Sequence, residues 1–167
     1  MLMEEVCARQ NLMAAHRRVV RNGGAPGIDG MTVEELMPHC REHWARIREK
    51  LLSDTYKPQP VRRVEIPKPN GKGKRMLGIP TVLDRLIQQA LLQVLTPIFD
   101  PTFSEDSYGF RPGKSQHNAL DALYVAITQR KVSWVLDADI RGFFDTAQHP
   151  LKMANLAIAA TLFRRGD

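Results

Sequence analysis

Few features of this sequence mark a secreted, disulfide-bonded or membrane-spanning protein. Its 167 residues include two cysteines, Cys7 and Cys40, which fit neither a disulfide framework nor a zinc site, so we expect both to be buried structural thiols. There is no run of about eighteen apolar residues and no signal-peptide pattern, so we expect a soluble, cytoplasmic protein. Internal repeats, low-complexity tracts and linkers are also missing, which predicts one domain or part of a larger one.

Acidic residues are nearly missing from one stretch of the chain. From Lys57 to Arg75 the sequence has seven basic residues and one acid, Glu65, so this stretch accounts for the whole net charge of +6. Because phosphate contacts supply most of the non-specific affinity for nucleic acids, this concentration of cations favours a polyanionic partner. The alternative is a basic surface that meets only solvent.

The periodicity of apolar residues predicts four helices and one β-hairpin. The helices are expected over residues 4–22, 32–52, 81–97 and 115–128, and the strands over 61–66 and 74–79 with a turn at 69–71. Capping patterns mark three of the helix starts: Thr32 with Glu35, then Thr81, then Ser115.

Several apolar side chains are expected in the core. Trp44 falls on the apolar stripe of the second helix, and the third helix is apolar almost all round, which is typical of a buried helix. Pro97 and Pro101 are expected to end that third helix. The side chains expected to face inward from the fourth helix are Leu120, Leu123 and Ile127.

The most informative stretch is residues 134–145, which read Trp-Val-Leu-Asp-Ala-Asp-Ile-Arg-Gly-Phe-Phe-Asp. An apolar strand here delivers Asp137 and Asp139 at its exit, and both point the same way because side chains alternate across a strand. Burying two acids together is costly, and a divalent metal removes that cost. Phe143 and Phe144 follow, where a flat substrate can pack. The pattern favours a metal-dependent phosphoryl-transfer centre over a surface turn.

Three of these side chains have structural alternatives. Asp137 fits equally well as a cap or as a partner of Arg141. Asp145 suits the first turn of a following helix better than a metal site, and Phe143 suits the core, pointing away from Phe144. The five histidines show no ligand spacing with one another, so we assign none of them to the metal.

Four segments resemble, in order, the front half of group II intron-type reverse transcriptases. They are Gly24-Ala-Pro-Gly-Ile-Asp-Gly30; Val64-Glu-Ile-Pro-Lys-Pro together with Lys74-Arg-Met-Leu-Gly-Ile-Pro80 and Asp84-Arg-Leu-Ile-Gln-Gln89; Ser107-Tyr-Gly-Phe-Arg-Pro-Gly-Lys-Ser115; and Leu136-Asp-Ala-Asp-Ile-Arg-Gly-Phe-Phe-Asp145. The resemblance implies an α+β fold, with the fingers and the start of the palm of a right-hand polymerase. It implies a reverse transcriptase domain over residues 1–146 and leaves 147–167 as a divergent tail.

The same resemblance implies roles for individual residues. Asp139 is expected to be the first metal-binding aspartate, Ile140 to offer its backbone carbonyl to the metal, and Phe144 to exclude the ribose 2′-hydroxyl. Lys68 and Arg75 are expected to hold the nucleoside triphosphate, with Arg111 contacting template or nucleotide. The residues expected to contact RNA are Arg62, Arg63, Lys72, Lys74 and Lys114. The implied cofactor is Mg²⁺, and the implied partners are an RNA template such as intron RNA, a DNA primer and dNTP.

The family's second metal motif, Tyr-x-Asp-Asp, is missing, and the 167 residues contain no Asp-Asp pair. One aspartate site cannot build a two-metal clamp, so we expect a truncated or frameshifted reverse transcriptase that is inactive alone. A non-catalytic RNA-binding or maturase-like module is the main alternative. A phosphatase that begins from Asp-x-Asp after an apolar strand fits less well, because Ile140 follows the second aspartate and the strand comes late, behind a basic hairpin.

Overall fold

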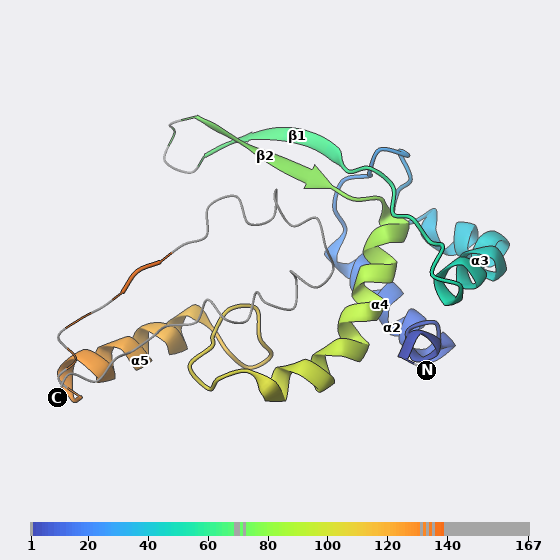
Figure 1. Ribbon diagram of the computed structural model, residues 1–167. Helices are drawn as coiled ribbons and strands as arrows, with labels where there is room; N and C mark the ends of the chain where they lie inside the picture. Colours follow the sequence, from blue (N-terminus) through green and yellow to red (C-terminus); the bar gives the residue numbers. More distant parts are fainter. Residues whose placement is uncertain are drawn as a thin grey trace. The chain divides into compact units, whose positions relative to one another are not determined.

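The computed structural model describes residues 2–68, 71, 73–130, 132, 134 and 136–138 (Figure 1). The chain divides into two units, Met1–Ile98 and Phe99–Asp167, which are described separately. Helices and one antiparallel pair of strands make up the regular structure of the described residues, as the α+β prediction requires. None of the helices in these ranges is both long and apolar enough to cross a membrane.

The N-terminal region forms two helices where the sequence predicted one. Helix α1 spans Leu2–Val6 and helix α2 spans Arg9–Asn22, with Ala8 between them in extended backbone. Val6 and Cys7 are adjacent in the chain, yet they pack into two different hydrophobic clusters and are 1% and 5% exposed. The break lets neighbouring residues fill both clusters, which a continuous amphipathic helix with one apolar stripe does not provide.

Helix α3 spans Leu36–Leu52 and ends where the sequence predicted. The Thr32 backbone N–H donates to Glu35 Oε2 at 2.8 Å, which is half of the predicted capping box. This contact closes the turn before the helix, so the helix itself begins one residue after Glu35. Trp44 is half-buried against the cluster that contains Cys7 and Ile47, which confirms its predicted packing role. Cys7 is buried as expected, whereas Cys40 is only partly buried.

Helix α4 spans Val82–Phe99 and contributes buried side chains to both hydrophobic clusters of the first unit. Its Val82, Leu86 and Ala90 are at most 3% exposed and share a cluster with Ala15 and Val19 of α2. Burial is not uniform round the helix, because Leu92 is 55% exposed. Pro97 lies inside the helix, so the prediction that it ends the helix is wrong. Two more helical residues follow it before the 3₁₀ turn η1 at Asp100–Thr102.

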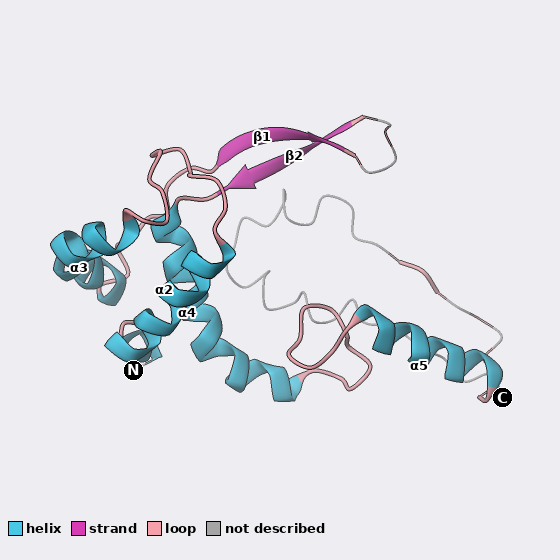
Figure 2. Ribbon diagram, turned by 180° about the vertical axis from the view of Figure 1, so that it is seen from behind, coloured by secondary structure: helices cyan, strands magenta, loops and turns pink. Residues whose placement is uncertain are grey.

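Strands β1 (Arg62–Pro67) and β2 (Lys74–Ile79) form the predicted hairpin, paired antiparallel from Arg62 opposite Ile79 to Pro67 opposite Lys74. The hairpin extends from the N-terminal end of α4 (Figure 2). Strand β2 is exposed from Lys74 to Gly78, and β1 alternates between half-buried and exposed residues. Most of the hairpin surface is therefore open to a partner.

The second unit contains η1, a loop and helix α5 at Gln116–Thr128. Ser115 Oγ accepts the Asn118 N–H, which confirms the predicted cap. The prediction that Leu120 and Ile127 face inward is wrong: they are 62% and 49% exposed, because no described element of this unit lies over them. The described residues of 132–138 also form no strand, and Trp134 is 85% exposed.

Candidate nucleic-acid interface

The register of the hairpin distributes its cations over two faces. Residues opposite each other in an antiparallel pair point to the same side, and successive residues alternate. Arg62 and Arg75 therefore share one face, and Arg63 and Lys74 share the other. Cations on both faces allow the hairpin to meet a phosphate backbone from either side.

The face with Arg62 and Arg75 is apolar between its two cations. The residues between them are Val64, Ile66 and Leu77. Leu77 is 45% exposed, so this face combines charged ends with apolar surface. The Nε of Arg62 is shielded from solvent and has no hydrogen-bond partner among the described residues. A shielded donor without a partner is uncommon in folded proteins.

The opposite face carries the one ion pair within the described hairpin. Lys74 Nζ lies 2.7 Å from Glu65 Oε2, and the two side chains are 69% and 53% exposed. Exposed pairs of this kind contribute little to stability, so a phosphate can replace the carboxylate at small cost. Arg63 is exposed and pairs with none of the described acids. Together these cations form a surface that is available to an anion.

The predicted triphosphate residues Lys68 and Arg75 both lie toward the tip of the hairpin. The Lys68 N–H donates to the Gly73 carbonyl at 3.1 Å, and Gly73 has a φ of 84°, which only glycine adopts freely. The side chains of Lys68 and Arg75 are exposed and pair with none of the described acids. Lys72 lies outside the described residues. The tip thus carries free positive charge, and its role toward a nucleotide stays a prediction.

A buried carboxylate holds the base of the hairpin, and the sequence showed only part of its role. Asp84 is 2% exposed and accepts three hydrogen bonds: from Tyr56 Oη at 2.7 Å, the Gln59 N–H at 3.1 Å and Thr81 Oγ1 at 2.6 Å. Its backbone N–H donates to Thr81 Oγ1 at 3.1 Å, which confirms the predicted cap. Burial, then the hydrogen bond to Asp84 and its charge, raises the pKa of Tyr56 above its ordinary value. The sequence does carry a signal for this buried role, because Asp84 is an acid among the apolar core positions of α4.

The glycine-rich segment at 24–30 lies against the same end of α4. Arg85 donates to the carbonyls of Gly23 and Ala25 at 2.8 and 3.2 Å. At Gly27 an added Cβ would lie 2.6 Å from Thr81 Cα, so only glycine allows this approach. The first turn of α4 therefore anchors both this loop and the hairpin.

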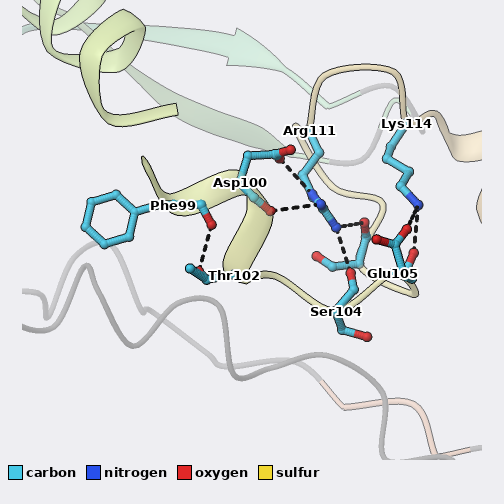
Figure 3. Close-up of polar contacts among 8 residues, drawn as sticks. Phe99, Asp100, Thr102, Ser104, Glu105, Arg111 and Lys114 are labelled. Atoms are coloured by element: carbon cyan, nitrogen blue, oxygen red, sulfur yellow. Dashed lines mark hydrogen bonds and ion pairs between the residues drawn. The ribbon is translucent and has the colours of Figure 1, made fainter. Parts of the chain in front are cut away.

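In the second unit Arg111 organises the loop between η1 and α5 (Figure 3). Its guanidinium donates to Asp100 Oδ1 at 2.8 Å and to the carbonyls of Asp100, Ser104 and Ser107 at 3.0, 2.6 and 3.1 Å. These bonds use four of its five N–H donors, and its side chain is 8% exposed. The predicted contact between Arg111 and template or nucleotide stays a prediction, because its described contacts are all within the loop.

Lys114 makes a second tie in the same loop. Its Nζ lies 2.8 Å from the Glu105 carbonyl, 3.0 Å from Glu105 Oε2 and 5.3 Å from the centre of the Tyr108 ring. The hydrogen bond from Lys114 lowers the pKa of Glu105, and that from Arg111 lowers the pKa of Asp100. Both acids therefore keep their charge, and their pairing with these cations, to a lower pH than ordinary carboxyl groups.

The predicted metal and gate residues Asp139, Ile140 and Phe144 lie outside the described residues. Asp137 is described and exposed. Within the described ranges no three His, Cys, Asp or Glu side chains gather into a metal site. The donors expected near Asp139 are carboxylate and carbonyl oxygens, which are the ligands that Mg²⁺ prefers. The residue types fit the ion, and their roles stay a prediction.

Comparison with known proteins identifies the family. Residues 66–162 match the family of reverse transcriptases (RNA-dependent DNA polymerases). Similar proteins include Protein YkfC of Escherichia coli, 40% identical over 147 residues, and the group II intron-encoded protein LtrA of Lactococcus lactis, 38% identical over 135 residues. Nuclear intron maturase 2 of Arabidopsis thaliana is 36% identical over 66 residues, which are 36% of this chain and 9% of that protein.

The aligned parts cover 85% and 81% of this chain but 38% and 22% of YkfC and LtrA. The chain thus spans well under half the length of these relatives. The match extends over more than half of the chain and includes the hairpin from Ile66, the Arg111 loop and Asp139. The chain belongs to the reverse transcriptase family, and within it to the group II intron type.

Proposed function

We propose that this chain is the fingers and the beginning of the palm of an RNA-directed DNA polymerase, and that its basic hairpin grips template RNA. The observation that carries the proposal is the set of exposed cations on both faces and at the tip of β1 and β2. RNA backbones are bound largely through phosphate and ribose contacts, and an extended ribbon with cations on both faces presents many such contacts.

The residues proposed to bind the nucleotide and its metal are those that the family resemblance implies. Lys68 and Arg75 supply positive charge for a triphosphate, and Asp139 with the Ile140 carbonyl supplies oxygen ligands for Mg²⁺. Phe144 is the proposed gate: a bulky ring beside the sugar excludes a 2′-hydroxyl sterically and selects dNTP over ribonucleotide. Lys114 is proposed to contact RNA and Arg111 to contact template or nucleotide. Both lie in the loop before α5, and the hydrogen bonds of Arg111 to Asp100 hold that loop in shape.

Catalysis by two metals requires further carboxylates, and these 167 residues offer no Asp-Asp pair. We therefore expect this chain alone to bind RNA without extending a primer. The measurement is primer extension with Mg²⁺ and dNTP. Strong extension that Asp139→Ala abolishes would show that the chain builds the whole site by itself.

A second candidate function is RNA binding without catalysis, as in an intron maturase. The described cations serve it equally well, and one of the similar proteins is named a maturase. The two functions separate at Asp139. Under the first proposal Asp139→Ala removes Mg²⁺-dependent binding of dNTP to the RNA-bound chain. Under the second, RNA binding falls steeply with salt and is unchanged by Asp139→Ala.

RNA binding itself is tested with paired charge variants. Arg63→Gln with Lys74→Gln removes one arginine and one lysine from the hairpin, and both side chains are exposed. Arg46→Gln with Lys50→Gln removes the same charges from the exposed side of α3. We expect the hairpin variant to raise the Kd for single-stranded RNA about tenfold and the α3 variant to change it less than about threefold. Equal effects would mean that only net charge matters, and no binding by the unmodified chain would refute the proposal.

A further inference from the structure

The side chain of Asp84 binds the segment just before the hairpin and the segment just after it. Gln59 lies three residues before β1 begins, and its N–H donates to Asp84 Oδ2 at 3.1 Å. Thr81 lies two residues after β2 ends, and its hydroxyl donates to the same oxygen at 2.6 Å. A single carboxylate oxygen thus joins the chain entering the hairpin to the chain leaving it.

The second oxygen of this carboxylate makes a further tie. Asp84 Oδ1 accepts the Tyr56 hydroxyl at 2.7 Å, and Tyr56 packs against the cluster that contains Ile47, Leu51 and Ile87. Charge-assisted hydrogen bonds in a buried place are short and directional. The entry of the hairpin is therefore fixed to the core as well as to its exit.

The anchor itself has little freedom to move. Asp84 lies in the first turn of α4, between the fully buried Val82 and the buried Leu86. The glycine-rich loop presses on Thr81 at Gly27, and Arg85 holds that loop through two carbonyls. By contrast, β2 is exposed along Lys74–Gly78, so the direction of the hairpin depends on its base.

We infer that Asp84 is a positioning residue for the nucleic-acid site: it fixes the base of the hairpin and thereby sets where the hairpin cations meet RNA. The inference rests on the proposed function, because it requires the hairpin to bind RNA. Asp84 itself is buried and touches no RNA. It acts through Gln59, Thr81 and Tyr56.

The chemistry of the site predicts an order among variants. Asp84→Ala leaves two hydroxyls and one backbone N–H without their acceptor. Asp84→Asn keeps an acceptor oxygen toward Gln59 and Thr81, and its amide can donate to the Tyr56 hydroxyl, which is able to accept. Tyr56→Phe removes one of the three bonds. The matched control is Asp121→Ala, the same change at an exposed position of α5.

The test measures the Kd for single-stranded RNA at several salt concentrations with the full chain. We expect Asp84→Ala to raise the Kd about tenfold and to lower the slope of log Kd against log salt by about 1, because misplaced cations make fewer phosphate contacts. Asp84→Asn is expected to stay within about threefold of the unmodified chain, with Tyr56→Phe between the two. A purely structural role would reduce the fraction of active protein and leave the slope unchanged, which would overturn the inference.

A double-mutant cycle separates this inference from the proposed function. The hairpin change Arg63→Gln with Lys74→Gln is measured in the unmodified chain and with Asp84→Ala, after circular dichroism has shown that each variant is folded. Positioning predicts a smaller loss from the hairpin change when Asp84 is already absent. Equal losses in both backgrounds contradict the inference while leaving RNA binding by the hairpin intact. If Asp84→Ala does not fold, the same cycle with Tyr56→Phe decides the question.

Discussion

The contact between the glycine-rich loop and α4 gives a sharp stability prediction. At Gly27 an added Cβ would lie 2.6 Å from Thr81 Cα, 2.8 Å from Thr81 N and 3.0 Å from Pro80 C. All three atoms belong to backbone, and Thr81 is pinned by its bonds to Asp84. The neighbours cannot yield as a flexible side chain would, so Gly27→Ala must push the loop away from the helix.

We expect Gly27→Ala to lower the free energy of unfolding by about 1–3 kcal/mol, the usual cost of overpacking. In a chain of this size each kcal/mol lowers Tm by roughly 2–4 °C. The matched control is Gly30→Ala, where the φ of 74° disfavours alanine but no atom lies near the new Cβ. That backbone cost is about 1–2 kcal/mol and comes without a clash.

The assay is urea unfolding of the full chain followed by circular dichroism, with thermal melting as a second measure. The contact also anchors the base of the hairpin, so Gly27→Ala is expected to weaken RNA binding more than Gly30→Ala does. A Gly27→Ala variant as stable as the unmodified chain, with equal RNA affinity, would refute the described packing of the loop.

Three further predictions test the core, the buried phenol and the Arg111 loop. Leu36→Ala, at a side chain with 0% exposure, should cost about 2–5 kcal/mol, and Leu2→Ala at 45% exposure less than about 1 kcal/mol, in urea titrations. Because folding raises the pKa of Tyr56, its contribution is complete below the ordinary phenol pKa of about 10 and is lost as pH rises toward the folded value, so Tyr56→Phe should flatten the alkaline loss of stability in pH-dependent melting curves. Because Arg111 lowers the pKa of Asp100, their pairing is complete above the ordinary carboxyl pKa and is lost as pH falls through the lowered one. Amide protection in the loop should fall over that range, and Asp100→Asn should remove the acid step.

Local patterns in the sequence predicted the elements of the fold well. The hairpin strands, the ends of α2 and α3, and the caps at Thr81 and Ser115 follow from alternation, helical spacing and capping chemistry, which act between near neighbours. Sequence did not predict the break at Ala8, because that break depends on two clusters built from distant segments. Sequence also did not predict that Leu120 and Ile127 are exposed, because an apolar stripe on a helix does not show whether another element covers it.

The candidate site was predicted in part. Charge density located the hairpin, and its described cations other than the half-buried Arg62 are exposed, as an anion-binding surface requires. The buried ties of Asp84 to Tyr56 and Gln59 reach 28 and 25 residues along the chain, which no local pattern reveals. Arg111 was assigned to a ligand by resemblance, whereas its described bonds are to its own loop. The roles of Asp139, Ile140 and Phe144 stay predictions.

The most direct test of RNA binding by the hairpin is to map where RNA touches the chain. Single-stranded RNA that carries 4-thiouridine is cross-linked to the full chain by ultraviolet light, and the attached peptides are identified by mass spectrometry. We predict that cross-links concentrate in residues 62–79 and decline with added salt, because phosphate contacts hold the RNA there. Cross-links confined to other segments, with residues 62–79 unmodified at saturating RNA, would contradict the proposal.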